Sequence, residues 1–204
     1  RGWRQVLSPV VNIATDVRWG RVEETYGEDP FLSSIMGAAF VKPFEQMGIV
    51  TTPKHFVANV GEGGRDSYPI HADEEYLKKI HYPPFRACFN AGSRGVMTSY
   101  NSLNGVPNSM NHELLNVVLK DQWKFQGFVI SDAGAVGGAN VLHNTSPDYP
   151  TSGKLAIENG MDVIFQTSIQ HDELFSPLFK SGKVRATAID SAVMIVLTVK
   201  FELG

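Results

Sequence analysis

The chain has 204 residues, of which 43% are hydrophobic. That is enough for one packed domain but short of the roughly 250 residues of a complete (β/α)8 barrel. Its 18 basic and 21 acidic residues give a net charge of -3 without a basic block, which argues against nucleic acid as a partner. Cys88 is the only cysteine, so neither an intrachain disulfide nor a cysteine-based metal site can form. The sequence contains neither an apolar run of about 18 residues nor a signal peptide.

Five short apolar runs are rich in β-branched residues, which is typical of strands buried in a parallel sheet. They span residues 6–13, 48–52, 95–99, 127–131 and 161–165. The amphipathic segments between them are long enough for the crossovers that parallel strands require. This alternation predicts an α/β fold, for which a partial barrel is a candidate. No repeat or flexible linker divides the chain, so residues 1–204 are expected to form a single domain.

The first predicted helix has a clear start. Asp29 can cap its free backbone amides, and Pro30 suits the first helical position because its missing N–H costs nothing there. Its buried face is expected to include Ile35 and Val41, and Pro43 is expected to kink or shorten its last turn.

Three further helices are predicted along the chain. One covers residues 73–90, with its regularity interrupted by two prolines. Another follows Asn111 as a cap, with Lys120 turned toward water. The last is expected to begin near Thr187 as a cap, with Val193 in its apolar stripe.

Polar side chains occur where several predicted strands end, and in a parallel barrel these ends surround the open mouth where catalytic groups gather. Asp132 ends the run that starts at Gly127 and is followed by two small residues, so its carboxylate would have little bulk beside it. An ionised carboxylate in such a place can attack an anomeric carbon. The alternative is that Asp132 caps the following helix.

Lys54 and His55 end another predicted strand, where alternation would turn them to opposite faces. If both bind one sugar, the backbone must be distorted, as a non-proline cis peptide would do. Arg21 closes an Arg-Trp-Gly-Arg segment that could hydrogen-bond hydroxyls and stack on a pyranose, and Arg65 in the next loop could reach a hydroxyl. The alternatives are a solvated strand end and loop, and an ordinary core role for Trp19.

Metal and nucleotide sites are not supported. The histidines lack the close paired spacing of a metal-binding helix, and surface or packing roles are expected for them. The glycines at 134, 137 and 138 match neither the dinucleotide fingerprint nor the P-loop. The sequence therefore predicts a protein without a metal or cofactor.

Six strings in a fixed order then give a specific signal. They are Leu7-Ser-Pro-Val-Val-Asn-Ile, Arg18-Trp-Gly-Arg, Glu24-Thr-Tyr-Gly-Glu-Asp-Pro, Lys54-His-Phe, Ser99-Tyr-Asn and Gly127-Phe-Val-Ile-Ser-Asp. In these strings and their separations, the chain resembles glycoside hydrolase family 3 from about residue 5 to residue 203. The resemblance implies the C-terminal majority of a (β/α)8 TIM barrel, incomplete at its N-terminal end. It also implies a retaining exo-β-glycosidase, most simply a β-glucosidase or β-xylosidase.

The resemblance also implies roles for individual residues. Asp132 would be the nucleophile that forms a covalent glycosyl intermediate, and Tyr100 would lie beside it. Four side chains would hydrogen-bond the hydroxyls of the sugar at the cleavage point, namely Arg21, Lys54, His55 and Arg65. Ala133 stands where the family usually has an aromatic residue, so one wall of the sugar site is expected to be more open.

Two features of the family are expected outside the chain. An Asp that binds the outer hydroxyls would precede Arg1, where further sequence is expected, and the acid/base Glu would belong to a second α/β domain beyond residue 204. A retaining mechanism needs two carboxyl groups about 5 Å apart, so the isolated chain would contain one of them. The expected partners are an oligosaccharide or β-glycoside and that second domain, with no membrane. A periplasmic or secreted location rests on the resemblance alone.

Two alternative functions stay open at this point. The chain could be a non-catalytic sugar-binding or structural fragment, because it lacks the expected acid/base. It could also be a β-N-acetylhexosaminidase, a subgroup that takes its acid/base from a histidine after the Lys-His-Phe string. Val57-Ala-Asn stands here in place of the Pro-Gly-His expected for that subgroup.

Overall fold

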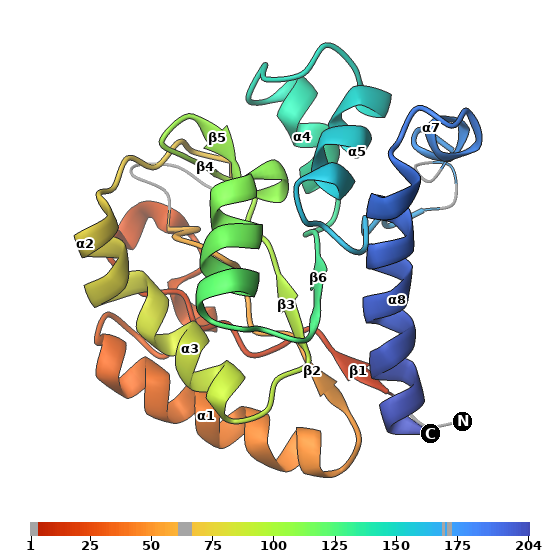
Figure 1. Cartoon of the computed structure of the whole chain (residues 1–204). Coiled ribbons are helices and arrows are strands. Elements are labelled where there is room, and N and C mark those ends of the chain that lie inside the picture. Colours follow the sequence, from red (N-terminus) through yellow and green to blue (C-terminus); the bar gives the residue numbers. More distant parts are fainter. Residues whose placement is uncertain (1–3, 61–66, 169, 171–172) are drawn as a thin grey trace. The chain divides into compact units, whose positions relative to one another are not determined.

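The computed structural model describes residues 4–60, 67–168, 170 and 173–204. They fall into two compact units, unit 1 (Arg1–Gly105) and unit 2 (Val106–Gly204). Each unit combines short strands with helices (Figure 1). The predicted mixed α/β character is thus confirmed, whereas the described residues do not form a closed barrel.

The described elements of each unit are short apart from two long helices, α1 with 17 residues and α8 with 18 residues. The strands of unit 1 are β1 (Gln5–Val6), β2 (Val50–Thr51), β3 (Gly95–Met97) and β4 (Ser102–Leu103). Its helices are η1 (Val17–Trp19), η2 (Val22–Glu24), α1 (Pro30–Gln46), α2 (Glu74–Tyr76), η3 (Leu77–His81) and α3 (Tyr82–Asn90). Unit 2 contains β5 (Val106–Pro107), η4 (Asn108–Met110), η5 (Glu113–Gln122), β6 (Phe128–Ile130), α4 (Ala135–Val141), α5 (Tyr149–Glu158), α7 (Ser176–Lys180) and α8 (Ala186–Leu203).

The first three predicted strands of unit 1 are neighbours in one parallel ladder. β1 pairs with β2, and the pairing continues where the N–H of Val11 donates to the carbonyl of Lys54 at 3.0 Å. The N–H of Phe56 then donates to the carbonyl of Met97 at 2.7 Å, which joins the second segment to the third. The ladder therefore brings the carboxyl ends of these segments to one edge of the unit.

The start of α1 confirms the sequence prediction. The Asp29 carboxylate accepts a hydrogen bond from the N–H of Phe31 at 2.8 Å, and Pro30 is the first helical residue. The helix then continues through Pro43 to Gln46, so the expected shortening at Pro43 does not occur. A proline near the end of a helix removes only its own N–H from the ladder, and α1 tolerates that loss.

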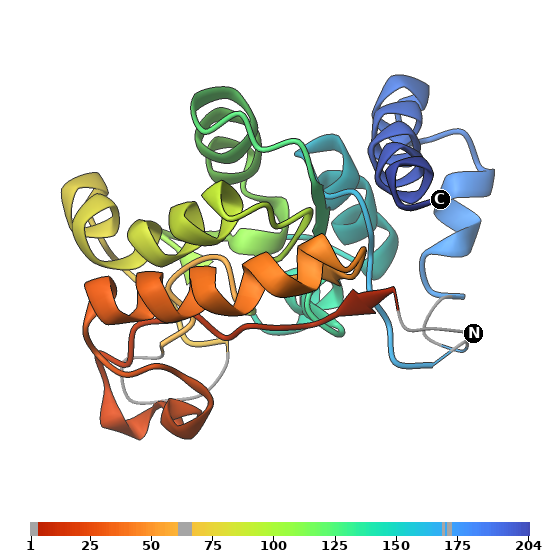
Figure 2. The same cartoon turned by 90° about the horizontal axis from the view of Figure 1, so that it is seen from below.

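The predicted buried face of α1 is correct at Val41 and wrong at Ile35. Ile35 is 53% exposed, and the buried residues are Ser33, Gly37 and Val41. A Cβ atom at Gly37 would lie 2.9 Å from the Cys88 sulfur in α3, closer than real Cβ contacts. α1 and α3 lie side by side in Figures 1 and 2, and α1 turns its smallest residue toward this close approach.

The second predicted helix is a continuous run of α2, η3 and α3. It starts where predicted, because the Asp73 carboxylate accepts from the N–H of Tyr76 at 2.7 Å. The wide π-helical turn η3 ends at His81, two residues before Pro83, which has no N–H to donate. The interruption expected from the prolines is confirmed.

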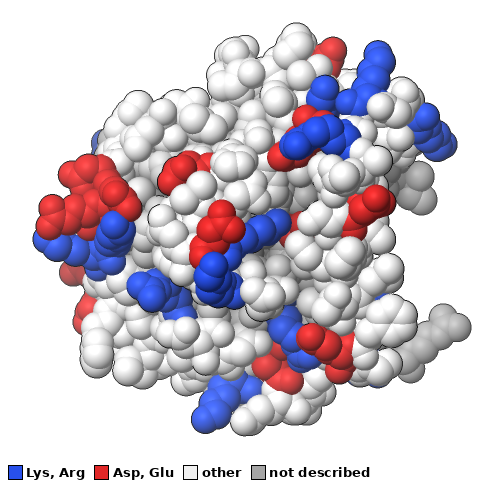
Figure 3. All heavy atoms as spheres, viewed as in Figure 1, with Lys and Arg blue, Asp and Glu red and all other residues white. Residues whose placement is uncertain are grey.

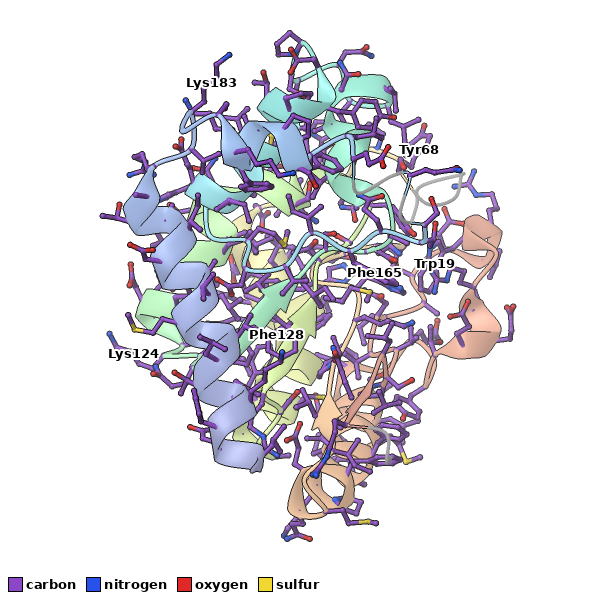
Figure 4. All side chains as sticks on the ribbon, turned by 90° about the vertical axis from the view of Figure 1, so that its right-hand side faces the viewer. Trp19, Tyr68, Lys124, Phe128, Phe165 and Lys183 are labelled. Carbon is purple, nitrogen blue, oxygen red and sulfur yellow. The ribbon has the colours of Figure 1, made fainter. Side chains whose placement is uncertain are left out.

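In unit 2, β6 runs parallel to the fifth predicted strand, since Ile130 bridges Val163. Figure 4 labels Phe128 on β6 and Phe165 on this neighbouring segment. In the fifth segment, strand pairing is limited to the bridge at Val163, where the N–H of Ser131 donates to the Val163 carbonyl at 2.9 Å. The predicted parallel pair is therefore present but short.

Three expectations for the helices of unit 2 are wrong. The ammonium group of Lys120 does not turn toward water but donates to the carbonyl of Gly160 at 2.7 Å, because the buried Asp162 carboxylate lies 3.3 Å away. Thr187 is not a cap, because α8 begins at Ala186. Val193 in the expected apolar stripe of α8 is 50% exposed.

The surface carries mixed charge. Over α2 and η3, Glu74 pairs with Lys78 and Glu75 pairs with Lys79, and these acidic and basic side chains lie together in Figure 3. These pairs place acidic and basic groups side by side on this face.

Among the described residues, no helix combines the length and hydropathy needed to cross a membrane.

A buried carboxylate joins α1 to two strands of unit 1. Glu45 Oε1 accepts from the N–H of Thr51 at 2.6 Å, from the Thr51 hydroxyl at 2.7 Å and from the N–H of Arg94 at 3.2 Å. Its Oε2 accepts from Arg94 Nε at 2.7 Å. The Glu45 side chain is only 7% exposed, so this pair lies largely out of water.

Replacing Glu45 should therefore destabilise the fold strongly. We expect Glu45→Ala to lower the free energy of unfolding by about 3 to 5 kcal/mol, because it leaves a part-buried Arg94 and two strand amides without their acceptor. Urea unfolding monitored by circular dichroism measures the loss. The matched control is Glu75→Ala, which removes an exposed carboxylate paired with Lys79, and it should change the value by less than about 1 kcal/mol. Equal effects would contradict the assignment.

The pH dependence of stability should include a contribution from His81. Burial lowers the pKa of His81 from 6.5 to about 4, so between these pH values the unfolded chain binds a proton that the folded chain does not. This contribution should lower the free energy of unfolding as the pH falls from about 6.5 to about 4, by about 3 kcal/mol in total. His81→Gln should flatten that part of the profile in urea titrations at several pH values. The exposed His112→Gln should not, and an unchanged slope in His81→Gln would refute the assignment.

Candidate functional site

The second segment of the ladder in unit 1 carries the adjacent Lys54 and His55. The peptide bond between them is cis, which is the kind of backbone distortion that the sequence analysis considered for this pair. Lys54 is half-buried and His55 is completely buried. The pair thus lies at the carboxyl end of its segment. On one side Lys54 bridges Val10 of the first segment, and on the other side Phe56 bridges Thr98 of the third segment.

Asn12, at the end of the first segment, holds His55 in place. The side-chain amide nitrogen of Asn12 donates to the carbonyl of His55 at 2.9 Å, and its oxygen accepts from the N–H of His55 at 2.7 Å. The same oxygen lies 3.0 Å from Nδ1 of the imidazole. This role of Asn12 was not predicted, and its position one residue before the end of an apolar run was the available signal.

Arg21 is buried beside the helical turns η1 and η2. Its guanidinium group forms two hydrogen bonds with the Glu24 carboxylate, at 2.7 and 2.8 Å. This fork geometry fixes the orientation of the guanidinium group. Trp19, labelled in Figure 4, is fully buried, which supports the core interpretation of that residue.

Tyr100 and Arg65 complete the predicted residues that precede unit 2. Tyr100 follows Ser99, whose N–H donates to the carbonyl of Phe56 at 2.8 Å. Tyr100 therefore lies at the carboxyl end of the third segment, on the same edge of the ladder as His55. Tyr100 is half-buried. Arg65 lies outside the described residues.

Asp132 follows β6 at the carboxyl end of the parallel pair in unit 2, as predicted. It is only 8% exposed, and its Oδ1 accepts from the N–H of Ala133 at 2.7 Å. A hydrogen bond from an amide favours the charged form of a carboxylate. The following helix α4 begins at Ala135 with Gly134 as its N-cap, so the bond from Ala133 lies outside the helix.

A second buried carboxylate in unit 2 provides a contrast. Burial raises the pKa of Asp162, while the ammonium group of Lys120 and the N–H of Val129 act in the opposite direction. The N–H of Val129 donates to its Oδ2 at 2.7 Å. A perturbed pKa is a general marker of functional groups. Asp162, however, precedes the bridging Val163 and so lies at the amino end of the strand pair, which indicates a structural role.

A cavity of about 460 Å³ in unit 2 does not contain the predicted site residues. Its lining is mostly apolar and includes Ile157, Val163, Ile164, Phe175 and Phe179. The polar residues of the lining are Asp162, Gln166 and Ser176, and none of them is a predicted site residue. We therefore assign the candidate site to the strand ends and not to this cavity.

Polar groups near the Lys-His segment were missed by the sequence analysis. The amide nitrogen and oxygen of Asn59 and the hydroxyl of Thr98 are buried and have no hydrogen-bond partner among the described residues. Buried polar groups of this kind normally bind water or a ligand. Neither residue stands out in the sequence. Among the described residues, no cluster of three or more His, Cys, Asp or Glu side chains could hold a metal ion.

Comparison with known proteins gives a consistent result. The 36% identical periplasmic β-glucosidase of Salmonella typhimurium aligns with 100% of this chain and 27% of its own length. A β-xylosidase of Formosa agariphila is 33% identical over 100% of this chain and 30% of its own length. The crystal structure of a β-glucosidase from Listeria innocua in complex with glucose superposes with a TM-score of 0.88 at 30% identity, covering 98% of this chain and 29% of that chain.

The chain thus spans less than a third of the length of these relatives. The family described as "Glycosyl hydrolase family 3 N terminal domain" matches residues 1–199, nearly the whole chain. The matched region contains all six strings identified in the sequence. The chain therefore belongs to glycosyl hydrolase family 3 and corresponds to part of its N-terminal domain.

Proposed function

We propose that this chain is the nucleophile-bearing part of a retaining exo-β-glycosidase that acts on β-glucosides or β-xylosides. The observation that carries the proposal is the family match over residues 1–199, together with a buried Asp132 at the carboxyl end of a parallel strand pair. The related proteins are described as β-glucosidases and β-xylosidases. We further propose that residues 1–204 are one domain, the C-terminal majority of a family 3 barrel.

The proposed chemistry begins with attack by an Asp132 carboxylate oxygen on the anomeric carbon. The new carbon–oxygen bond forms as the bond to the leaving group breaks, and the leaving oxygen takes a proton from an acid outside this chain. Water then hydrolyses the glycosyl ester and regenerates the carboxylate. The N–H of Ala133 supports the ionised nucleophile that the first step requires.

The remaining residues are proposed to bind the sugar. Arg21, Lys54 and His55 would hydrogen-bond its hydroxyls, as would Arg65, and Tyr100 would lie beside the nucleophile. The bidentate contact with Glu24 supports this role for Arg21, because it fixes the guanidinium group before a sugar arrives. Arg21 and His55 thus have their orientation set by protein contacts.

The proposal predicts a covalent adduct on Asp132. An activated 2-deoxy-2-fluoro-β-glucoside has a leaving group that needs little protonation, so the chain should form the glycosyl ester without an acid/base residue. Intact-mass analysis should show one sugar adduct on the chain and none on Asp132→Asn. Asp162→Asn makes the same change at another buried carboxylate of unit 2, and should keep the adduct if circular dichroism shows that it folds.

The outcomes separate the possible functions. An adduct without turnover of aryl glycosides would mean that the chain carries the nucleophile but needs its acid/base from elsewhere. Adduct formation only in a longer polypeptide that includes this chain would mean that the residues are correct but the chain is not sufficient. Failure of glucoside and xyloside reagents to label either polypeptide would contradict the glycosidase assignment and favour a non-catalytic sugar-binding or structural role.

A further inference from the structure

The contact between Asn12 and His55 fixes more than the position of a side chain. Asn12 is 1% exposed and His55 is fully buried, so neither group exchanges hydrogen bonds freely with water. Three polar atoms of His55 face the Asn12 amide, namely its N–H, its carbonyl oxygen and the imidazole Nδ1. This set of contacts determines where the imidazole proton lies.

The backbone of His55 first fixes the orientation of the Asn12 amide. A peptide N–H can only donate and a carbonyl oxygen can only accept. The Asn12 atom 2.7 Å from the His55 N–H must therefore be the oxygen, and the atom 2.9 Å from the His55 carbonyl must be the nitrogen. An exchange of the two atoms, which side-chain amides often allow, would break both bonds.

The orientation of the amide then fixes the tautomer of His55. The atom that faces Nδ1 at 3.0 Å is the same Asn12 oxygen, and an amide oxygen can only accept. Nδ1 must therefore carry a proton. In a neutral imidazole the second nitrogen, Nε2, then has no proton and acts as a hydrogen-bond acceptor.

We propose that Asn12 is a positioning residue that holds His55 with its proton on Nδ1, so that Nε2 accepts a hydrogen bond from a sugar hydroxyl. This inference rests on the proposed function, because it requires that His55 contacts the sugar. Lys54, the neighbour of His55, offers donors and no acceptor. The pair therefore presents opposite polarities to the sugar, with donors from Lys54 and one acceptor from His55.

These polarities have a consequence for recognition. A hydroxyl that faces Nε2 must donate its proton, and fluorine at that position cannot do so. A hydroxyl that only accepts from Lys54 has no such requirement. The inference thus predicts that one hydroxyl of the sugar must donate a hydrogen bond to Nε2 of His55. Replacing this hydroxyl by fluorine should then weaken binding as much as removing it.

The tautomer can be measured without a sugar. We would record nitrogen-15 spectra of labelled imidazoles about two pH units above the ordinary histidine pKa of 6.5, and assign His55 by its loss in His55→Gln. The expected spectrum has a protonated Nδ1 and an unprotonated Nε2. A proton on Nε2 of His55 in the unaltered chain would overturn the inference whatever the variants do.

Variants separate positioning from general stability. Asn12→Ala removes the acceptor and should lower the population of the Nδ1-protonated form. Asn104→Ala is the matched control, because Asn104 makes the same pair of contacts with the N–H and carbonyl of Ala72, at 3.0 and 2.8 Å. It should leave the His55 tautomer unchanged. An unchanged tautomer in Asn12→Ala would overturn the positioning role.

Sugar binding provides the final readout. Glucose should shift the Nε2 resonance of His55 and leave Nδ1 nearly unchanged. Asn12→Ala should slow labelling by the fluoro glucoside about tenfold, against less than about twofold for Asn104→Ala. No shift and no labelling, either of the chain or of a longer polypeptide that includes it, with the proton on Nδ1, would overturn the proposed function and leave the tautomer assignment standing. Labelling with the proton on Nε2 would overturn the tautomer assignment and leave the proposed function standing.

Discussion

The buried carboxylate of Glu45 is the constraint on which the ladder of unit 1 depends. It accepts hydrogen bonds from the backbone at the start of the second and third segments, through Thr51 and Arg94. Because each segment rises by a fixed length per residue, fixing two starts also fixes the level at which the two segments end. Those ends carry His55 and Tyr100. A contact at the amino edge of the ladder therefore sets the relative height of groups at its carboxyl edge.

The two edges of the ladder are held by groups of different charge. At the amino edge, the Glu45 carboxylate pairs with the Arg94 guanidinium group and also accepts from Thr51. At the carboxyl edge, the neutral amide of Asn12 satisfies the backbone of His55 without adding a charge. A neutral support suits a group that is proposed to accept a hydrogen bond from a sugar, because a nearby carboxylate would favour the charged imidazolium and remove its acceptor.

Much of the fold could be predicted from the sequence, because the strands are continuous apolar runs and α1 has an unambiguous start at Asp29. The buried faces of the helices could not. The apolar pattern of α1 favours Ile35, yet the close approach to α3 is decided by Gly37, whose missing side chain carries no hydrophobic signal. The strand-end placement of Asp132 and Lys54 followed from the pattern. The role of Asn12 did not, since it depends on a neighbour 43 residues away.

The same close approach of α1 and α3 has a practical consequence. Cys88 is the only sulfhydryl group of the chain, and burial in α3 raises the pKa of its thiol to about 12. The thiolate is the reactive form, so an alkylating reagent can modify Cys88 only in molecules in which these helices have separated. Because unit 2 contains no cysteine, alkylation in native buffer counts the openings of unit 1 alone. The rate of Cys88 alkylation therefore measures how often α1 and α3 separate in the native protein.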